Sequence, residues 1–304
     1  MGNCYKEQLA KFREDDEARW KYETSELERQ FAAQEKIGRS DDTEKKDLEK
    51  AGINVKALDE QSRQWAKKEA QAHREISKIE PPPPTNRRKE PIDLDKVAAL
   101  AGSHTWLYPP AFNGWGNTEE CGFNLALGEI NPEKHMTGDG WGLQAVAYGT
   151  QYCTLWFYYF PPSPGELLVQ PHVDFQGNVA VSAYDHWYTS THAELRLKLH
   201  FDLFQHYWDG EQSAAIINEH RHNSSSAYWV DDHRIMSKSL SVSANDIVWI
   251  KLTTSLFVVA HSSHAHVDVD FRSGSSRRIR VEHIWINLTP VRSISPVTTF
   301  QTAA

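Results

Sequence analysis

Two different patterns of hydrophobic and polar residues divide the chain. Residues 4–36 contain no proline or glycine, and their apolar side chains recur at spacings of three, four or about seven. This spacing predicts an amphipathic α-helix, although Asp16 interrupts the apolar stripe. Glycines then separate a second short helix, ending near Ala51, from a third over residues 54–79. The first part of the chain is therefore predicted to be helical.

The pattern of the helical segment does not determine what the helices pack against. In the third helix, apolar side chains recur every seven residues from Leu58 to Ile79, but the other seam position includes Ser62 and Glu69. Half of a heptad seam is compatible with a coiled coil, and equally with a helical hairpin that folds on itself or on the second domain. A segment with so few apolar residues cannot form its own core in any of these arrangements.

After residue 120 the pattern changes to short β-rich runs separated by turn residues. Residues 193–203 alternate strictly between apolar and polar side chains, and similar alternation returns over 248–252 and 265–271. Such runs are typical of strands with one buried face. Residues 151–160 are aromatic on both faces, so this strand is expected either to be covered twice or to form a contact surface. Over 277–289 the alternation slips, which predicts a β-bulge near His283.

These observations predict an all-β main domain preceded by a charged helical segment. We expect eight to ten strands in an antiparallel, jelly-roll-like β-sandwich, because no helix–strand alternation is present. The charge distribution agrees, since 36 of the first 80 residues are charged but only 38 of the remaining 224. Four consecutive prolines follow that boundary. The predicted organisation is a charged helical arm over 1–80, a Pro-rich linker over 81–92 and the sandwich over 93–304.

Composition excludes several classes of protein. The net charge of −8 disfavours a nucleic-acid-binding protein, because phosphate contacts need a surplus of Lys and Arg. No apolar run reaches the roughly 18 residues of a membrane span, and no apolar signal segment opens the chain. A cytoplasmic location, or one within an assembled particle, is therefore expected. Of the three cysteines, Cys121 and Cys153 lie in apolar, strand-like surroundings and are expected to be buried rather than nucleophilic.

Histidines suggest one divalent metal site. On a strand, His264 and His266 share a face, and side chains at such spacing can bind the same ion. His172 and Asp174 form a His-x-Asp pair, which could supply two ligands of a facial triad completed by a distal histidine. The simpler interpretation, favoured here, is that the polar side chains near His264 and His266 form a solvated surface.

Aromatic loops suggest a different ligand. Trp106, Tyr108, Trp115 and Trp141 lie in segments rich in Gly, Pro, Asn and Asp, where rings can stack on sugars or anchor a protein contact. The alternative is that these rings fill the ends of the sandwich, and this alternative is favoured.

The first hypothesis for function is a non-enzymatic structural or interaction protein, in which the helical arm forms a homo-oligomer and the sandwich packs against or binds a glycan or protein partner. The alternatives are a metal-dependent jelly-roll enzyme of the non-haem iron type and a lectin-like carbohydrate-binding module. An enzyme is less expected, because the nucleophile-elbow, phosphate-loop and zinc-protease motifs are all missing from the sequence.

Overall fold

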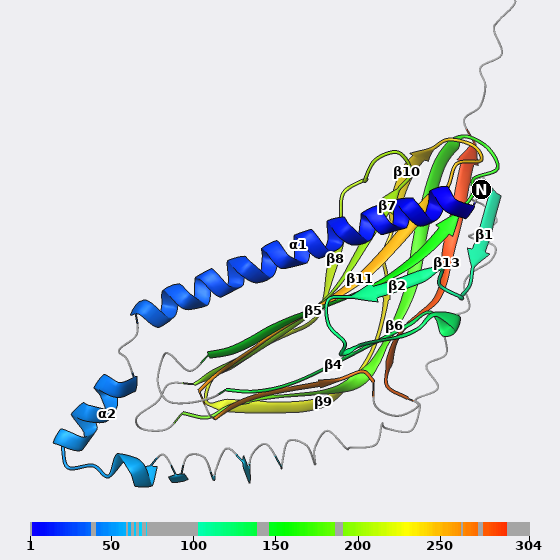
Figure 1. The fold of residues 1–304 in the computed structure, drawn as a ribbon. Helices are drawn as coiled ribbons and strands as arrows, with labels where there is room; N and C mark the ends of the chain where they lie inside the picture. The colour runs from blue at the N-terminus through cyan, green and yellow to red at the C-terminus, as the bar shows by residue number, and fades with distance from the viewer. Residues whose placement is uncertain are drawn as a thin grey trace, which may run out of the picture.

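The computed structural model contains two antiparallel β-sheets packed face to face, with a long helix lying across one of them (Figure 1). The predicted all-β sandwich and its preceding helical segment are thus confirmed. The structure describes residues 2–37, 41–58, 60, 61, 64, 67, 68, 71, 103–138, 146–185, 191–262, 264–272 and 276–290.

In the described part of the chain, one sheet has eight strands and the other has five, so the expected eight to ten strands were too few. The eight-stranded sheet contains β1 (Ser103–Leu107), β3 (Cys121–Asn124), β4 (Glu129–Thr137), β6 (Gly165–Ala183), β9 (Ser224–Ile235), β10 (Lys238–Val242), β12 (Ala265–Asp270) and β13 (Arg278–Pro290). The five-stranded sheet has the order β2 (Asn113–Gly116), β5 (Val146–Tyr159), β11 (Val248–His261), β7 (His192–Phe204) and β8 (Gln212–Arg221). A single 3-10 turn, η1 (Leu125–Leu127), is described between β3 and β4.

The long strand β6 organises the eight-stranded sheet. Along one edge it pairs first with β13 and then with β12, and along the other edge with β10 and then β9. The register between β6 and β13 shifts between Val281 and His283, which confirms the bulge predicted near His283. Side chains alternate along β6, so that Val173 and Phe175 lie in the core while His172 and Asp174 lie on the outer face.

The core between the sheets is continuous and apolar. Fully buried rings and branched chains from both sheets, such as Phe157, Phe175 and Phe201, fill it. Cys121 on β3 and Cys153 on β5 are buried as expected, and they also form a disulfide that joins the two sheets. The bond closes a segment of 32 residues, so it restricts the unfolded chain as well as the folded one.

The helix α1 (Gly2–Ile37) lies on the outer face of the five-stranded sheet and runs antiparallel to β5 (Figure 1). Its rings pair with every fourth residue along β5 and just beyond its end, and these pairs are Tyr5 with Phe160, Phe12 with Trp156, Trp20 with Tyr152 and Phe31 with Tyr148. The helical segment from the first to the last of these rings rises about 39 Å. The corresponding stretch of strand spans about 40 Å, so the two repeats stay in step. Residues 151–157 are therefore covered on both sides, whereas Tyr158 and Phe160 beyond them are exposed.

A buried ion pair lies in the middle of this contact. Lys251 of β11 donates a hydrogen bond to Asp16 of α1, and the side chains are only 11% and 6% exposed. The indole Nε1 of Trp115 donates to the second carboxylate oxygen of Asp16, at 3.1 Å. Burial raises the pKa of Asp16, while Lys251 and Trp115 partly oppose that shift. The interruption of the apolar stripe at Asp16 is therefore a specific polar contact with the sheet.

A second polar contact holds the middle of the helix. Arg19 donates to Glu211 at 2.6 Å, and His200 of β7 lies 2.8 Å from the other carboxylate oxygen of Glu211. Burial would raise the pKa of Glu211, but the hydrogen bonds from His200 and Arg19 outweigh it and hold the pKa below its ordinary value of 4.5. Glu211 is therefore a carboxylate that the folded state favours in its charged form.

The apolar side of α1 is thus occupied by its own sandwich. Leu9, Phe12 and Trp20 are buried there, so these residues are not available to a coiled coil or to a hairpin with α2 (Asp41–Lys50). Of the alternatives for the arm, packing on the second domain is the arrangement observed for α1. Oligomerisation stays a prediction. The linker predicted at 81–92 lies outside the described residues.

Candidate functional site

The outer face of the eight-stranded sheet, on the side away from α1, carries two neighbouring rows of side chains. In the first row, the register places Ile235 of β9 opposite His172 of β6, and His172 opposite His283 of β13. The rings of Trp106 and Tyr108 continue this row from β1 and the loop after it, with centroids 4.9 and 6.0 Å from that of His283. Four strands, spaced about 4.8 Å apart, give the row a length of about 14 Å.

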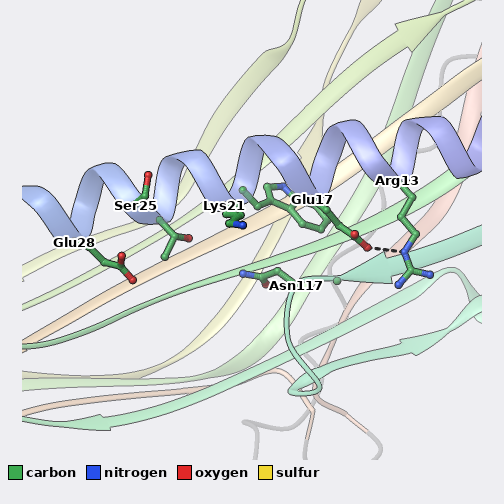
Figure 2. Close-up of a pocket in the computed structure, with 9 residues that line it drawn as sticks. Arg13, Glu17, Lys21, Ser25, Glu28 and Asn117 are labelled. Atoms are coloured by element: carbon green, nitrogen blue, oxygen red, sulfur yellow. Dashed lines mark hydrogen bonds and ion pairs between the residues drawn. The ribbon is translucent and has the colours of Figure 1, made fainter.

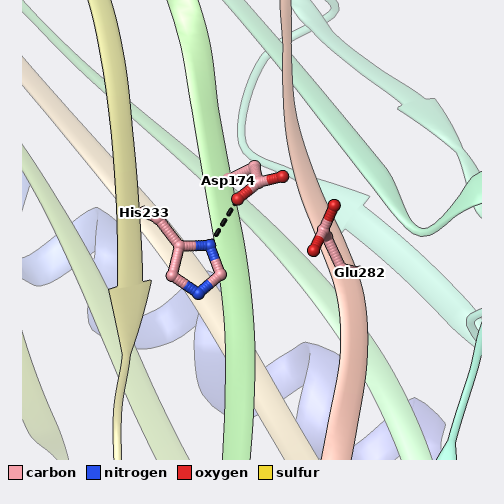
Figure 3. Close-up of side chains that lie close together, drawn as sticks. All are labelled: Asp174, His233 and Glu282. Carbon is pink, nitrogen blue, oxygen red and sulfur yellow. Dashed lines mark hydrogen bonds and ion pairs between the residues drawn. The ribbon is translucent and has the colours of Figure 1, made fainter. Parts of the chain in front are cut away.

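The second row is polar. His233 of β9 lies opposite Asp174 of β6, which lies opposite Arg280 of β13. The Nδ1 atom of His233 is hydrogen-bonded to Asp174, as Figure 3 shows. Glu282 reaches toward Asp174 from β13, and one donor atom from each of Asp174, His233 and Glu282 lies within 4.8 Å of the other two.

The two rows are in contact through histidine. The Nε2 atom of His233 lies 3.3 Å from Nδ1 of His172. The ring of His172 in turn stacks on that of His283, with centroids 4.2 Å apart. A carboxylate-and-histidine cluster and a pair of larger aromatic rings therefore form one continuous surface, which we call the outer-face site.

The bulge in β13 builds this surface. Val281 pairs with Val173, and His283 pairs with the adjacent His172. Glu282 is therefore an extra residue that has no partner position on β6. In a regular strand, neighbouring residues point to opposite faces. Here the bulge allows Glu282 and His283 to lie on the same outer face, while Ile284 returns to the core.

The predicted metal ligands do not gather in one place. His172 and Asp174 belong to the outer-face site, but His266 pairs with Ser182 at the other end of β6. Eight residues of extended strand separate Ser182 from Asp174, a distance of about 26 Å. His264 and His266 are 1% and 0% exposed, so the solvated surface expected around them is also not what the structure shows. The facial triad of His172, Asp174 and one of these histidines is not assembled.

The predicted aromatic residues also separate into groups. Trp106 is half-buried and Tyr108 is exposed, and both lie in the outer-face site. Trp115 is buried beneath α1, where its indole contacts Asp16, so it is not accessible to a ligand. Trp141 lies outside the described residues.

A second hollow lies along α1. A pocket of about 600 Å³ is bordered by charged residues of the helix and by Asn117 after β2 (Figure 2). Two of its charged groups, Arg13 and Glu17, are paired with each other at 2.8 Å. On the other side of the helix a pocket of about 450 Å³ lies over β5 and β7. Both hollows follow from the seating of a round helix on a flat sheet.

A second group of histidines forms a stack across the five-stranded sheet. His192 of β7 lies opposite His261 of β11, with ring centroids 4.7 Å apart, and 5.8 Å from the ring of His220. Burial lowers the pKa of His192, as do the neighbouring His261 and His220. Glu194 acts in the opposite direction and raises the pKa of His192.

Comparison with known proteins gives only distant likenesses. No protein-family model and no curated protein matches the chain. Among solved structures, CBM35 from Cellvibrio japonicus Abf62 is similar at a TM-score of 0.23 and 8% identity, over 62% of this chain and 95% of that one. TmCBM61 in complex with β-1,4-galactotriose is similar at a TM-score of 0.22 and 11% identity, over 59% and 95% of the two chains.

A third structure, the GH115 4-O-methyl-α-glucuronidase BtGH115A, is similar at a TM-score of 0.19 and 13% identity, over 54% of this chain and 18% of that one. Scores and identities this low carry no argument about function. No helix in the described part of the chain is both long and apolar enough to cross a membrane.

Sequence patterns identified part of the outer-face site, including the rings of Trp106 and Tyr108. The motif at His172 and Asp174 marked β6, and the loss of alternation marked the bulge that positions Glu282 and His283. His233 was missed, because only the pairing of β6 with β9 places it beside Asp174.

Proposed function

We propose that the protein is a non-enzymatic binding protein whose sandwich binds a carbohydrate at the outer-face site. The observation that carries this proposal is the ring of Tyr108, which is 61% exposed at the end of a row of rings that includes Trp106 and the imidazole of His283. Exposed aromatic rings offer an apolar face for the C–H groups of a sugar, and adjacent polar groups can bind its hydroxyls.

The composition of the two rows supports a carbohydrate rather than a purely apolar partner. The row with the rings also contains imidazole groups, and the next row contains carboxylates and a guanidinium group from Asp174, Glu282 and Arg280. Sugars need both kinds of contact, because each ring has hydroxyl groups at its edge and C–H groups on its faces. The length of the row, about 14 Å, suits a short oligosaccharide.

The enzyme hypothesis receives less support from the site. The iron-type triad needed a histidine of β12 beside His172 and Asp174, and the register of β12 on β6 keeps these residues at opposite ends of the strand. Tyr108 and His233 of the outer-face site are also exposed to solvent among the described residues, whereas an enzyme generally excludes water from its reacting groups.

The test is glycan binding by the full-length chain. Binding on an array, followed by titration calorimetry with the best oligosaccharide, should be weakened at least tenfold by Tyr108→Ala. Tyr207→Ala is the matched control, because Tyr207 is similarly exposed, at 55%, on a loop after β7. The proposal is overturned if no glycan binds, or if the two variants bind equally well.

A further inference from the structure

The carboxylate-and-histidine cluster of the outer-face site has the composition of a metal centre. Three strands contribute one donor each: β6 contributes Asp174, β9 contributes His233 and β13 contributes Glu282 (Figure 3). From these residues we infer that the protein binds one divalent first-row transition-metal ion, with zinc as the reference ion.

The distances suit such an ion. Two donor atoms that bind the same zinc ion at about 2.0–2.2 Å are at most about 4.4 Å apart. The donor atoms of Asp174, His233 and Glu282 lie within 4.8 Å of one another, so small side-chain rotations bring them together. They project from neighbouring strands of one sheet, whose backbone ladder fixes the positions from which they converge.

The histidine is also held in the orientation that a metal ligand needs. Metal-binding histidines use one ring nitrogen for the ion and donate a hydrogen bond from the other. His233 directs Nδ1 toward Asp174, and its Nε2 lies 3.3 Å from Nδ1 of His172. His172 therefore acts as a positioning residue that can accept the hydrogen bond from His233, and its own ring is fixed by stacking on His283.

The mixture of donors determines the class of metal. Calcium and magnesium prefer sites made of oxygen donors, whereas an imidazole nitrogen with two carboxylates suits zinc, manganese, iron, cobalt or nickel. Three protein ligands leave at least one coordination position of the ion open toward solvent.

Zinc binding to the full-length protein, after removal of metals by a chelator, tests this inference. Titration against a chromophoric zinc indicator should give one equivalent per chain in the micromolar range or tighter. His233→Ala and Glu282→Gln should each weaken binding at least tenfold. Cobalt(II) should give an absorption spectrum in the unchanged protein that is lost in His233→Ala.

Two control variants distinguish this site from other histidines. His206→Ala removes an exposed histidine that lies 3.6 Å from Asp246, another His–Asp pair, and should leave zinc binding unchanged. His192→Ala disrupts the histidine stack of the five-stranded sheet and should also leave it unchanged. The inference is overturned if the protein takes up no zinc, if His233→Ala binds as well as His206→Ala, or if His192→Ala removes the binding.

The outcome is independent of the proposed carbohydrate function, because the metal is titrated without any glycan. Zinc binding without glycan binding would leave the metal centre in place and refute the carbohydrate proposal. If the protein binds a glycan but no zinc, the metal inference is refuted and the carbohydrate proposal is retained.

Discussion

Asp16→Ala should release α1 from the sandwich while leaving the two sheets folded. The substitution removes the carboxylate that pairs with Lys251, whose side chain is only 11% exposed. A lysine left without its partner in such a place costs about 3–5 kcal/mol. The hydrogen bond from Trp115 to Asp16 is lost at the same time.

This cost is comparable to the free energy that holds the helix in place. The buried side chains of Leu9, Phe12 and Trp20 contribute about 1.5–3 kcal/mol each. Ordering the helix on the sheet opposes that gain through lost conformational entropy. Because detachment of α1 would return Lys251 to water, the cheapest response to Asp16→Ala is local undocking rather than global unfolding.

Limited proteolysis with trypsin measures the undocking, because α1 contains Lys11, Arg13, Arg19 and Lys21. Cleavage of a locally opened segment follows the population of the open form, so a loss of 3 kcal/mol should accelerate cleavage about 100-fold. The matched control is Asp15→Ala, which removes an exposed carboxylate next in sequence.

Equal cleavage rates for Asp16→Ala and Asp15→Ala would refute this account of the ion pair. A double variant, Asp16→Leu with Lys251→Met, provides a further check, since replacing both charges by apolar groups of similar size is often neutral or stabilising. Cleavage of this double variant should return toward that of the unchanged protein.

Three further outcomes follow from the same structure. Replacing Cys121 and Cys153 by Ala should lower the free energy of unfolding by about 3–4 kcal/mol, because the disulfide closes a segment of 32 residues. Urea denaturation measures this difference. A reductant that leaves the stability of the unchanged protein unaltered would contradict the prediction. Since the pKa of Glu211 lies below its ordinary 4.5, its contribution to stability should be complete above pH 4.5 and decline as the pH falls below it. Glu211→Gln should therefore have a flatter profile of melting temperature between pH 6 and 3. Gly177→Ala would place a Cβ atom 2.5 Å from the ring of Phe271 and 2.7 Å from the backbone oxygen of Asp270, which should lower the free energy of unfolding by about 1–3 kcal/mol. Urea denaturation measures this, and an unchanged midpoint would contradict it.

The architecture of the sandwich could be predicted because its strands are half buried. In residues 193–203 every second side chain faces the core, and burial follows that alternation residue by residue in β7. The doubly aromatic run at 151–160 indicated a strand covered on both sides or in a contact surface, and burial shows that it is covered over 151–157, while Tyr158 and Phe160 are exposed. Local periodicity carries this information because a one-residue slip would turn every core side chain outward.

The position of α1 could not be predicted in the same way. Its rings match residues of β5 more than 100 positions later in the chain, and neither pattern reveals the other. Asp16 was interpreted as an interruption of the apolar stripe, because its partner Lys251 is identified only when β11 is placed beneath the helix. The disulfide between Cys121 and Cys153 was missed for a similar reason, since it depends on how the two sheets face each other.

The outer-face site was predicted only in part, because contacts between strands depend on a register that the sequence does not reveal. His172 and Asp174 are on one strand and could be identified from their spacing. The distal ligand was sought at His264 or His266, which lie just before and on β12, a strand that does neighbour β6 but pairs with its opposite end. Knowing which strands are neighbours was therefore not enough to predict the site, because the register between them determines which residues come into contact.

The bulge in β13 has a consequence for how the site could be gained or lost in evolution. Glu282 is the one residue of this segment without a partner position on β6, with Val281 and His283 aligned to consecutive residues of that strand. Deleting the single codon for Glu282 would restore an uninterrupted ladder and keep every core side chain on its own face. The same deletion would remove one of the three metal donors. In this protein, a cluster of three donor side chains and a cluster of two are thus separated by one in-frame codon, which natural insertion and deletion can cross in either direction.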